Sequence, residues 1–183
     1  MGMESILVQV RQRGLTNPSF RSLSLYAQGP AVRQLQDSIN HRFEVLGIGD
    51  LLWLQVDGWF GNETIAAVKY LQCIGGLPVN GQVSLRTYTF ITDGAAGLEP
   101  LSFGSVGIGV LAVKQVLAKF VDSSIAQDSR FCELTAQAVK VYQQREGLVA
   151  DGRVGEKTWE SIVRSRLQSL PCISLIPDIY INN

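Results

Sequence analysis

An internal repeat is the feature of this sequence that most constrains its fold. When the chain is shifted against itself by 71 positions, Asp57 aligns with Asp128, and the tripeptide Ala-Val-Lys recurs in the same register. Upstream of this stretch the shift becomes 78 positions, so the first copy carries seven extra residues between its first predicted helix and its first motif. A register kept over so many positions indicates two copies of one structural unit, at residues 23–91 and 101–163.

A shorter motif recurs within each copy after 23 residues. It reads Asp or Asn, Gly or Ser, a variable residue, Phe or Val, a small residue, two variable residues and Thr. Asp or Asn followed by Gly favours a tight turn, and the small residue then leads into a helix start. We call the four instances corners 1 to 4: residues 57–64, 80–87, 128–135 and 151–158.

Apolar residues at helical spacing fill the segments between the corners. Val32, Leu35 and Ile39 mark the first helix of the first copy. In both copies a longer helix follows the first corner and ends at a Gly-Leu pair, which is typical of a glycine C-cap. A short third helix carries Tyr88 or Trp159 on its inward face.

The sequence therefore predicts a mainly α fold of two tandem three-helix bundles with short extended N- and C-terminal segments. The extended segments are expected at residues 5–10 and 179–182. The predicted parts are an N-terminal segment at 1–22, module 1 at 23–91, a linker at 92–100, module 2 at 101–163 and a C-terminal tail at 164–183.

Charge and terminal composition narrow the classes of partner. Sixteen basic residues balance sixteen acidic ones, which provides no attraction toward nucleic acid or an anionic membrane surface. We therefore expect no nucleic-acid and no membrane partner, and neutral polymers or proteins remain. Gln9, Arg11 and Arg13 interrupt the apolar start before it reaches the length of an export signal. The expected location is the cytoplasm, or the cell wall if the chain is exported or released by lysis.

The cysteines and the single histidine limit the chemistry. Cys73, Cys132 and Cys172 are odd in number, far apart and without metal-ligand spacing. We expect no disulfide framework and interpret each cysteine as a small buried apolar side chain. His41 is the only histidine, which excludes a zinc peptidase with several imidazole ligands. The sequence predicts no catalytic residue, no metal site and no cofactor, and thus a protein that is not an enzyme.

The order of these motifs resembles the peptidoglycan-binding domain of bacterial cell-wall hydrolases. Residues 57–72 read Asp-Gly-x-Phe-Gly-x-x-Thr-x-x-Ala-Val-x-x-x-Gln, and residues 147–159 read Gly-Leu-x-x-Asp-Gly-x-Val-Gly-x-x-Thr-Trp. The resemblance covers most of the chain, twice. It implies a three-helix module that docks on cell-wall polymer and usually targets a separate catalytic domain.

Each module departs from the family pattern in a different half. Corner 2 has Asn80, Ser84 and Tyr88 where the family favours Asp, Gly and Trp. Corner 3 has Ser129 and Cys132 in place of both glycines, and Lys114 aligns with Gln36 of the first copy. These departures bear on ligand binding more than on the fold, because the inward Phe, Val and Thr persist.

Candidate ligand-binding residues lie mainly at the corners. Trp59 takes the variable place of corner 1, where its ring could stack on a sugar, although coverage by the insertion that holds Trp53 and Leu54 is the favoured expectation. The aspartates are expected first of all to act as turn and cap residues. A corner arginine could bind the carboxylate of a stem peptide, although simple solvation is the favoured expectation. The candidates are Asp57, Trp59, Asn62, Tyr70, Asp128, Arg130, Asp151 and Arg153.

Two functions are compatible with this sequence. The first is non-catalytic binding of bacterial cell-wall peptidoglycan through tandem modules, which would target a separate hydrolase. The second is an intracellular protein-interaction or structural adaptor on a degenerate peptidoglycan-binding scaffold. The motif match favours the first function, whereas the departures at the corners and the absence of a recognised export signal favour the second.

Overall fold

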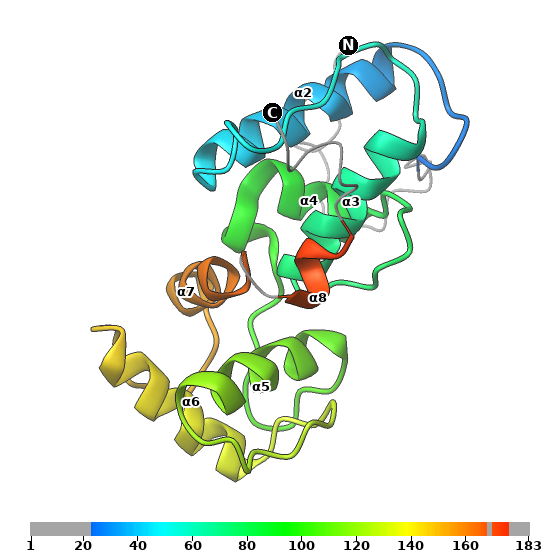
Figure 1. The fold of residues 1–183 in the computed structure, drawn as a ribbon. Helices are drawn as coiled ribbons and strands as arrows, with labels where there is room; N and C mark the ends of the chain where they lie inside the picture. The colour runs from blue at the N-terminus through cyan, green and yellow to red at the C-terminus, as the bar shows by residue number, and fades with distance from the viewer. Residues whose placement is uncertain (1–22, 168–169, 176–183) are drawn as a thin grey trace, which may run out of the picture.

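The computed structural model describes residues 23–167 and 170–175 of the chain, and it is mainly α-helical (Figure 1). This confirms the predicted fold class. The helices are α2 (Pro30–Val45), α3 (Asn62–Ile74), α4 (Leu85–Asp93), the 3-10 helix η1 (Gly94–Gly97), α5 (Ile108–Phe120), α6 (Glu133–Arg145), α7 (Glu156–Arg166) and α8 (Leu170–Ile173). The extended segments expected at residues 5–10 and 179–182 lie outside the described residues.

Two bundles of three helices form the two predicted modules. Helices α2, α3 and α4 make module 1 in the upper part of Figure 1, and α5, α6 and α7 make module 2 below it. In each module the segment before the first helix pairs with both corners through isolated antiparallel bridges. These bridges are Leu23 with Val83, Gln28 with Trp59, Leu101 with Val154 and Val106 with Arg130.

The apolar residues of the corner motifs form the centre of each core. The side chains of Phe60 and Phe131 are buried, and so are those of Val83 and Val154. Tyr88 and Trp159 are also buried on the inward faces of α4 and α7. The expected inward orientation of all these side chains is confirmed, and their burial supplies the hydrophobic free energy that holds corner and helix together.

Glycines end the central helices as expected. Gly76 has a φ of 63°, and the amide of Leu77 donates a 2.8 Å hydrogen bond to the carbonyl of Gln72. Gly147, with a φ of 68°, ends α6 in the same way. This six-to-one bond satisfies a carbonyl that would otherwise lack a partner at the helix end.

Residues 92–97 of the segment predicted as a linker are helical. Helix α4 continues to Asp93, and η1 follows directly. The buried guanidinium of Arg42 reaches from α2 and donates to the carbonyls of Ile91 (2.9 Å) and Thr92 (2.8 Å). Sequence composition did not predict this contact, because it joins residues about 50 positions apart.

The expected burial is confirmed for Cys73 and Cys172 and is wrong for Cys132, and the expectation of no disulfide is wrong. Cys73 in α3 and Cys172 in α8 form a disulfide with a Cα–Cα distance of 5.5 Å, a usual separation for such a bond. Cys132 is a free cysteine and is exposed. The disulfide joins residues 99 positions apart, so only the packing of α8 on α3 reveals the pair.

Among the residues described, no helix combines the length and the apolar character that a bilayer crossing requires.

Candidate functional site: the corners and the Trp59 cleft

A buried glutamine from α2 holds corner 1 together. The Gln36 carboxamide nitrogen donates to Asp57 Oδ1 (2.8 Å), the Trp59 carbonyl (3.1 Å) and Thr64 Oγ1 (3.2 Å). Its oxygen accepts the amide hydrogen of Gly58 at 2.9 Å. Only a carboxamide offers donors and an acceptor at one side-chain end in this way. One side chain therefore connects the positions of corner 1 that recur in the motif.

Gln72 in α3 and Gln143 in α6 hold corners 2 and 4 by the same arrangement. Each carboxamide nitrogen donates to the side chain of the first residue of its corner, to the backbone carbonyl two residues later and to the hydroxyl of the threonine that ends the motif. Each carboxamide oxygen accepts the backbone amide hydrogen of the corner glycine. The partners are Asn80, Gln82, Thr87 and Gly81 in corner 2, and Asp151, Arg153, Thr158 and Gly152 in corner 4.

Corner 3 is built differently, around a buried lysine. Lys114 is 2% exposed, and its ammonium group donates to Asp128 Oδ1 at 2.8 Å. An ammonium group has no acceptor, so it cannot receive the amide hydrogen of the next corner residue. That residue is Ser129, which does not have the positive φ of about 75° found at Gly81 and Gly152. The replacements of Gln by Lys and of Gly by Ser are therefore physically linked.

The corner aspartates act first as acceptors within the turn. The hydrogen bond from Gln36, and then that from the Trp59 amide, lower the pKa of Asp57. The hydrogen bond from Lys114 mainly lowers the pKa of Asp128, and that from the Arg153 amide mainly lowers the pKa of Asp151. All three carboxylates lie at the surface, and hydrogen bonds to the charged form favour ionisation.

These lowered pKa values predict acid sensitivity. A carboxyl group whose pKa is lower in the folded state stabilises the fold fully above its unfolded pKa of about 3.9, and this contribution is lost as the pH falls through the folded pKa. The double variant Asp57→Asn/Asp151→Asn should therefore show a flatter fall in thermal midpoint than the parent between about pH 5 and pH 2. Asn80 makes the equivalent turn bond in corner 2 at 2.9 Å, so the amide fits the turn. Equal slopes for parent and variant would refute this role.

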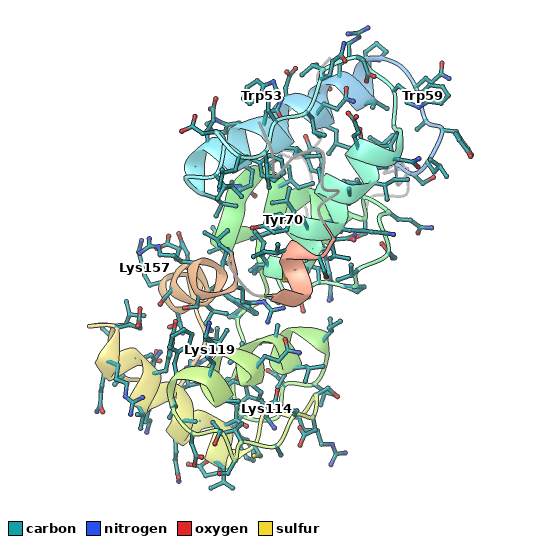
Figure 2. All side chains as sticks on the ribbon, viewed as in Figure 1. Trp53, Trp59, Tyr70, Lys114, Lys119 and Lys157 are labelled. Carbon is teal, nitrogen blue, oxygen red and sulfur yellow. A yellow bond between two sulfur atoms is a disulfide. The ribbon has the colours of Figure 1, made fainter. Side chains whose placement is uncertain are left out.

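Trp59 forms an aromatic surface beside corner 1. Its side chain is 41% exposed, and its ring lies 6.2 Å from that of exposed Tyr26, at an interplanar angle of 58°. The indole also lies over Gly61, where an added Cβ would come within 2.7 Å of Trp59 Cδ1. The expected coverage by the insertion is wrong, because Trp59 remains exposed and Trp53 lies well away from it in Figure 2.

A cleft of about 350 Å³ opens next to this surface. Trp59 and Leu54 supply apolar atoms to its wall, and Asp57, Asn62 and Glu63 supply polar ones. Asn62 and Glu63 are the first residues of α3 and are exposed. The cleft therefore combines an aromatic face with side chains that can accept or donate hydrogen bonds.

The eight predicted site residues do not form one site. Asp57, Trp59 and Asn62 meet at the cleft, whereas Asp128 and Arg130 lie on corner 3 and Asp151 and Arg153 on corner 4. Tyr70 is 2% exposed, and its hydroxyl donates to the carbonyl of Leu167 at 2.9 Å. Tyr70 thus belongs to the junction between the modules, and we leave it out of the candidate site.

The family model of the peptidoglycan binding domain matches residues 28–91 and 107–162. The chain belongs to this family. The two matched regions fall within the two bundles, one in each, and together they include all four corners. No curated protein and no solved structure matches the chain.

The glutamines are what sequence reasoning missed in these two peptidoglycan-binding modules. Gln72 and Gln143 each precede their corner by eight residues, a spacing visible in the sequence. Gln36 precedes corner 1 by 21 residues, and this distance includes the insertion. Across the described residues, no group of three or more His, Cys, Asp or Glu side chains could hold a metal ion.

Proposed function

We propose that this chain binds bacterial cell-wall peptidoglycan without cleaving it, and that the Trp59 cleft of module 1 makes the main contact. The observation that carries the proposal is the exposed Trp59, which lies beside the ring of Tyr26 and lines a cleft in a peptidoglycan-binding module. Aromatic rings at a surface provide a large apolar face, which suits the apolar face of a sugar ring.

The cleft also has the size and polarity for part of a glycan strand. Its volume of about 350 Å³ falls in the usual range of small-ligand sites, which begins near 300 Å³. Asn62 supplies an amide, and Glu63 a carboxylate, for the hydroxyl and acetamido groups of the sugars. Asp57 Oδ1 is already engaged by Gln36 and by the Trp59 amide, so its role here is to hold the turn.

Module 2 contributes through different chemistry. Arg130 stands at the place of Trp59, and Cys132 stands at the place of Gly61, so a Cβ atom fills the space over which the indole lies in module 1. Arg130 and Arg153 are both exposed. Their guanidinium groups would form forked hydrogen bonds with the carboxylates of stem peptides.

The proposed location is the cell wall, with a separate hydrolase as the enzyme that the modules target. The Cys73–Cys172 disulfide supports this location, because such bonds persist mainly in oxidising surroundings outside the cytoplasm. An intracellular adaptor is the alternative, and the exposed Phe103 and Val106 beside corner 3 are the surface that would favour it.

Co-sedimentation with purified insoluble peptidoglycan tests the proposal. We expect the folded chain to pellet with the polymer, and Trp59→Ala to raise the dissociation constant roughly tenfold, which corresponds to about 1.4 kcal/mol. Trp53→Ala is the matched control, since Trp53 is 55% exposed and does not line the cleft. The two variants should share the thermal midpoint of the parent. A folded chain that stays in the supernatant would remove the proposal and favour the adaptor.

A double-mutant cycle tests whether Gly61→Ala weakens peptidoglycan binding by displacing the Trp59 ring or by a general loss of structure. Gly61→Ala should weaken pelleting, because its Cβ would displace the Trp59 ring. The same change in a Trp59→Ala background should cost nothing further, since no ring is left to displace. Additive losses would show that residue 61 acts by another route.

A further inference from the structure

The last described helix returns from module 2 to module 1. Helix α8 follows α7 in the chain, yet it lies against α3 in Figure 1. The Cys73–Cys172 disulfide fixes it there, and both cysteines are buried. A helix of only four residues is too short to be stable alone, so its position depends on this bond and on its packing.

Arg166 connects three elements directly beneath the disulfide. It lies in α7, is 7% exposed, and donates through Nε (3.2 Å) and Nη2 (2.9 Å) to the carbonyl of Cys73 in α3. Its Nη1 donates to the carbonyl of Ala112 (3.2 Å) and to Gln115 Oε1 (2.8 Å), both in α5. One guanidinium group therefore ties the last helix of module 2 to both modules.

The disulfide shields these contacts from water. Arg166 Nη2 lies 3.9 Å from the sulfur of Cys73 and 4.0 Å from that of Cys172. Cys172 itself is completely buried. If α8 left α3, water would reach the guanidinium group and compete for the carbonyls, and hydrogen bonds exposed in this way contribute little net stability.

We propose that the Cys73–Cys172 disulfide is a clasp that fixes the orientation of the two modules, and that breaking this bond releases them. In the oxidised chain, α8 covers the contact of Arg166 with α3. In the reduced chain, α8 leaves α3 and the modules change their relative orientation while each keeps its own fold. The clasp follows from the junction alone and does not depend on peptidoglycan binding.

The opening step is ordinary thiol–disulfide exchange. One thiolate of a dithiol reductant attacks one sulfur of the pair, so a mixed disulfide forms and the other cysteine leaves as a thiolate. The second thiol of the reductant then attacks the mixed disulfide and becomes a cyclic disulfide. Two electrons pass to the protein, two protons come from the dithiol, and both cysteines end as thiols.

Single-molecule energy transfer on the full chain tests the clasp without any polymer. Dyes are attached to non-natural residues at His41 in module 1 and Val149 in module 2, both exposed, in a Cys132→Ala background that lacks the free thiol. We expect one narrow distance distribution for the oxidised chain. Excess dithiothreitol should abolish the narrow peak and leave the far-ultraviolet circular dichroism unchanged.

Cys172→Ala in this background provides the matched control. It should show the broad distribution before any reductant is added and should not respond to dithiothreitol. Thiol titration is done on the chain that retains all three cysteines. Before reduction it should label Cys132 only, and after reduction it should label all three. A narrow peak that survives full reduction, or three reactive thiols in the unreduced folded chain, would overturn the clasp.

Discussion

Gln143→Ala lowers the free energy of unfolding by about 3 kcal/mol, because it removes four hydrogen bonds at once and leaves the buried amide of Gly152 without its acceptor. Gln143 is 1% exposed. Its carboxamide serves Asp151, Arg153, Thr158 and the amide of Gly152. Each neutral bond contributes about 1 kcal/mol net, and a buried group left without a partner costs more than that.

Urea unfolding, followed by circular dichroism, measures this loss. Gln144→Ala is the matched control, since the neighbouring glutamine is exposed on the same helix and its loss should stay within about 0.5 kcal/mol. Equal effects of the two changes would show that Gln143 is not the centre of corner 4.

The side chains of corner 3 suggest how a destabilised variant of corner 4 could be rescued. Lys114 and Ser129 occur together in corner 3, so Gln143→Lys combined with Gly152→Ser should be more stable than Gln143→Lys alone. Serine disfavours the positive φ of 75° at which the Gly152 amide donates to the Gln143 carboxamide oxygen, so the turn should adopt the corner 3 conformation, in which the helix side chain supplies no acceptor. The urea midpoints of unfolding of the single and double variants test this rescue. A lower midpoint for the double variant than for the single variant would contradict the coupling.

Trp159→Ala should cost about 3 to 5 kcal/mol, the usual range for truncation of a buried aromatic side chain. Trp159 is 2% exposed, and its Nε1 donates to the carbonyl of Glu99 at 2.8 Å. The far edge of the ring lies where the backbones of Gly76 in module 1 and Gly109 in module 2 come together. Its loss leaves a cavity at the junction of the modules and one unpaired carbonyl.

Calorimetry gives the readout for Trp159→Ala. We expect a lower midpoint and a broader transition, because the two modules then unfold less cooperatively. Trp53→Ala is the control, since Trp53 is half-exposed on the insertion. A shift no larger than that of Trp53→Ala would place Trp159 outside the cooperative junction.

Divergence of the two modules is concentrated at corners 1 and 3. Corner 1 keeps the glutamine, both glycines and an exposed Trp59 over Gly61. Corner 3 replaces these with a buried lysine, Ser129 and Cys132, yet Phe131 still fills the core. The fold tolerates the change because the inward side chain and the terminal threonine are preserved, whereas the outer surface acquires a different chemistry.

The repeat, the helices, the corners and the inward side chains could all be predicted from the amino-acid sequence. These features depend on backbone preferences of neighbouring residues and on the period of apolar positions, as the C-cap at Gly76 and the burial of Phe60 show. The family follows from the same short-range pattern, because its motifs are turns followed by helices.

The contacts between side chains that are distant in sequence could not be predicted without the fold. Gln36 reaches corner 1 across 21 residues, and Cys73 pairs with Cys172 across 99. Tyr70 became part of the junction, and Trp59 remained open to solvent. The physical reason is that helix packing, which local propensity does not encode, brings these groups within hydrogen-bonding or covalent distance and sets which surface each side chain faces.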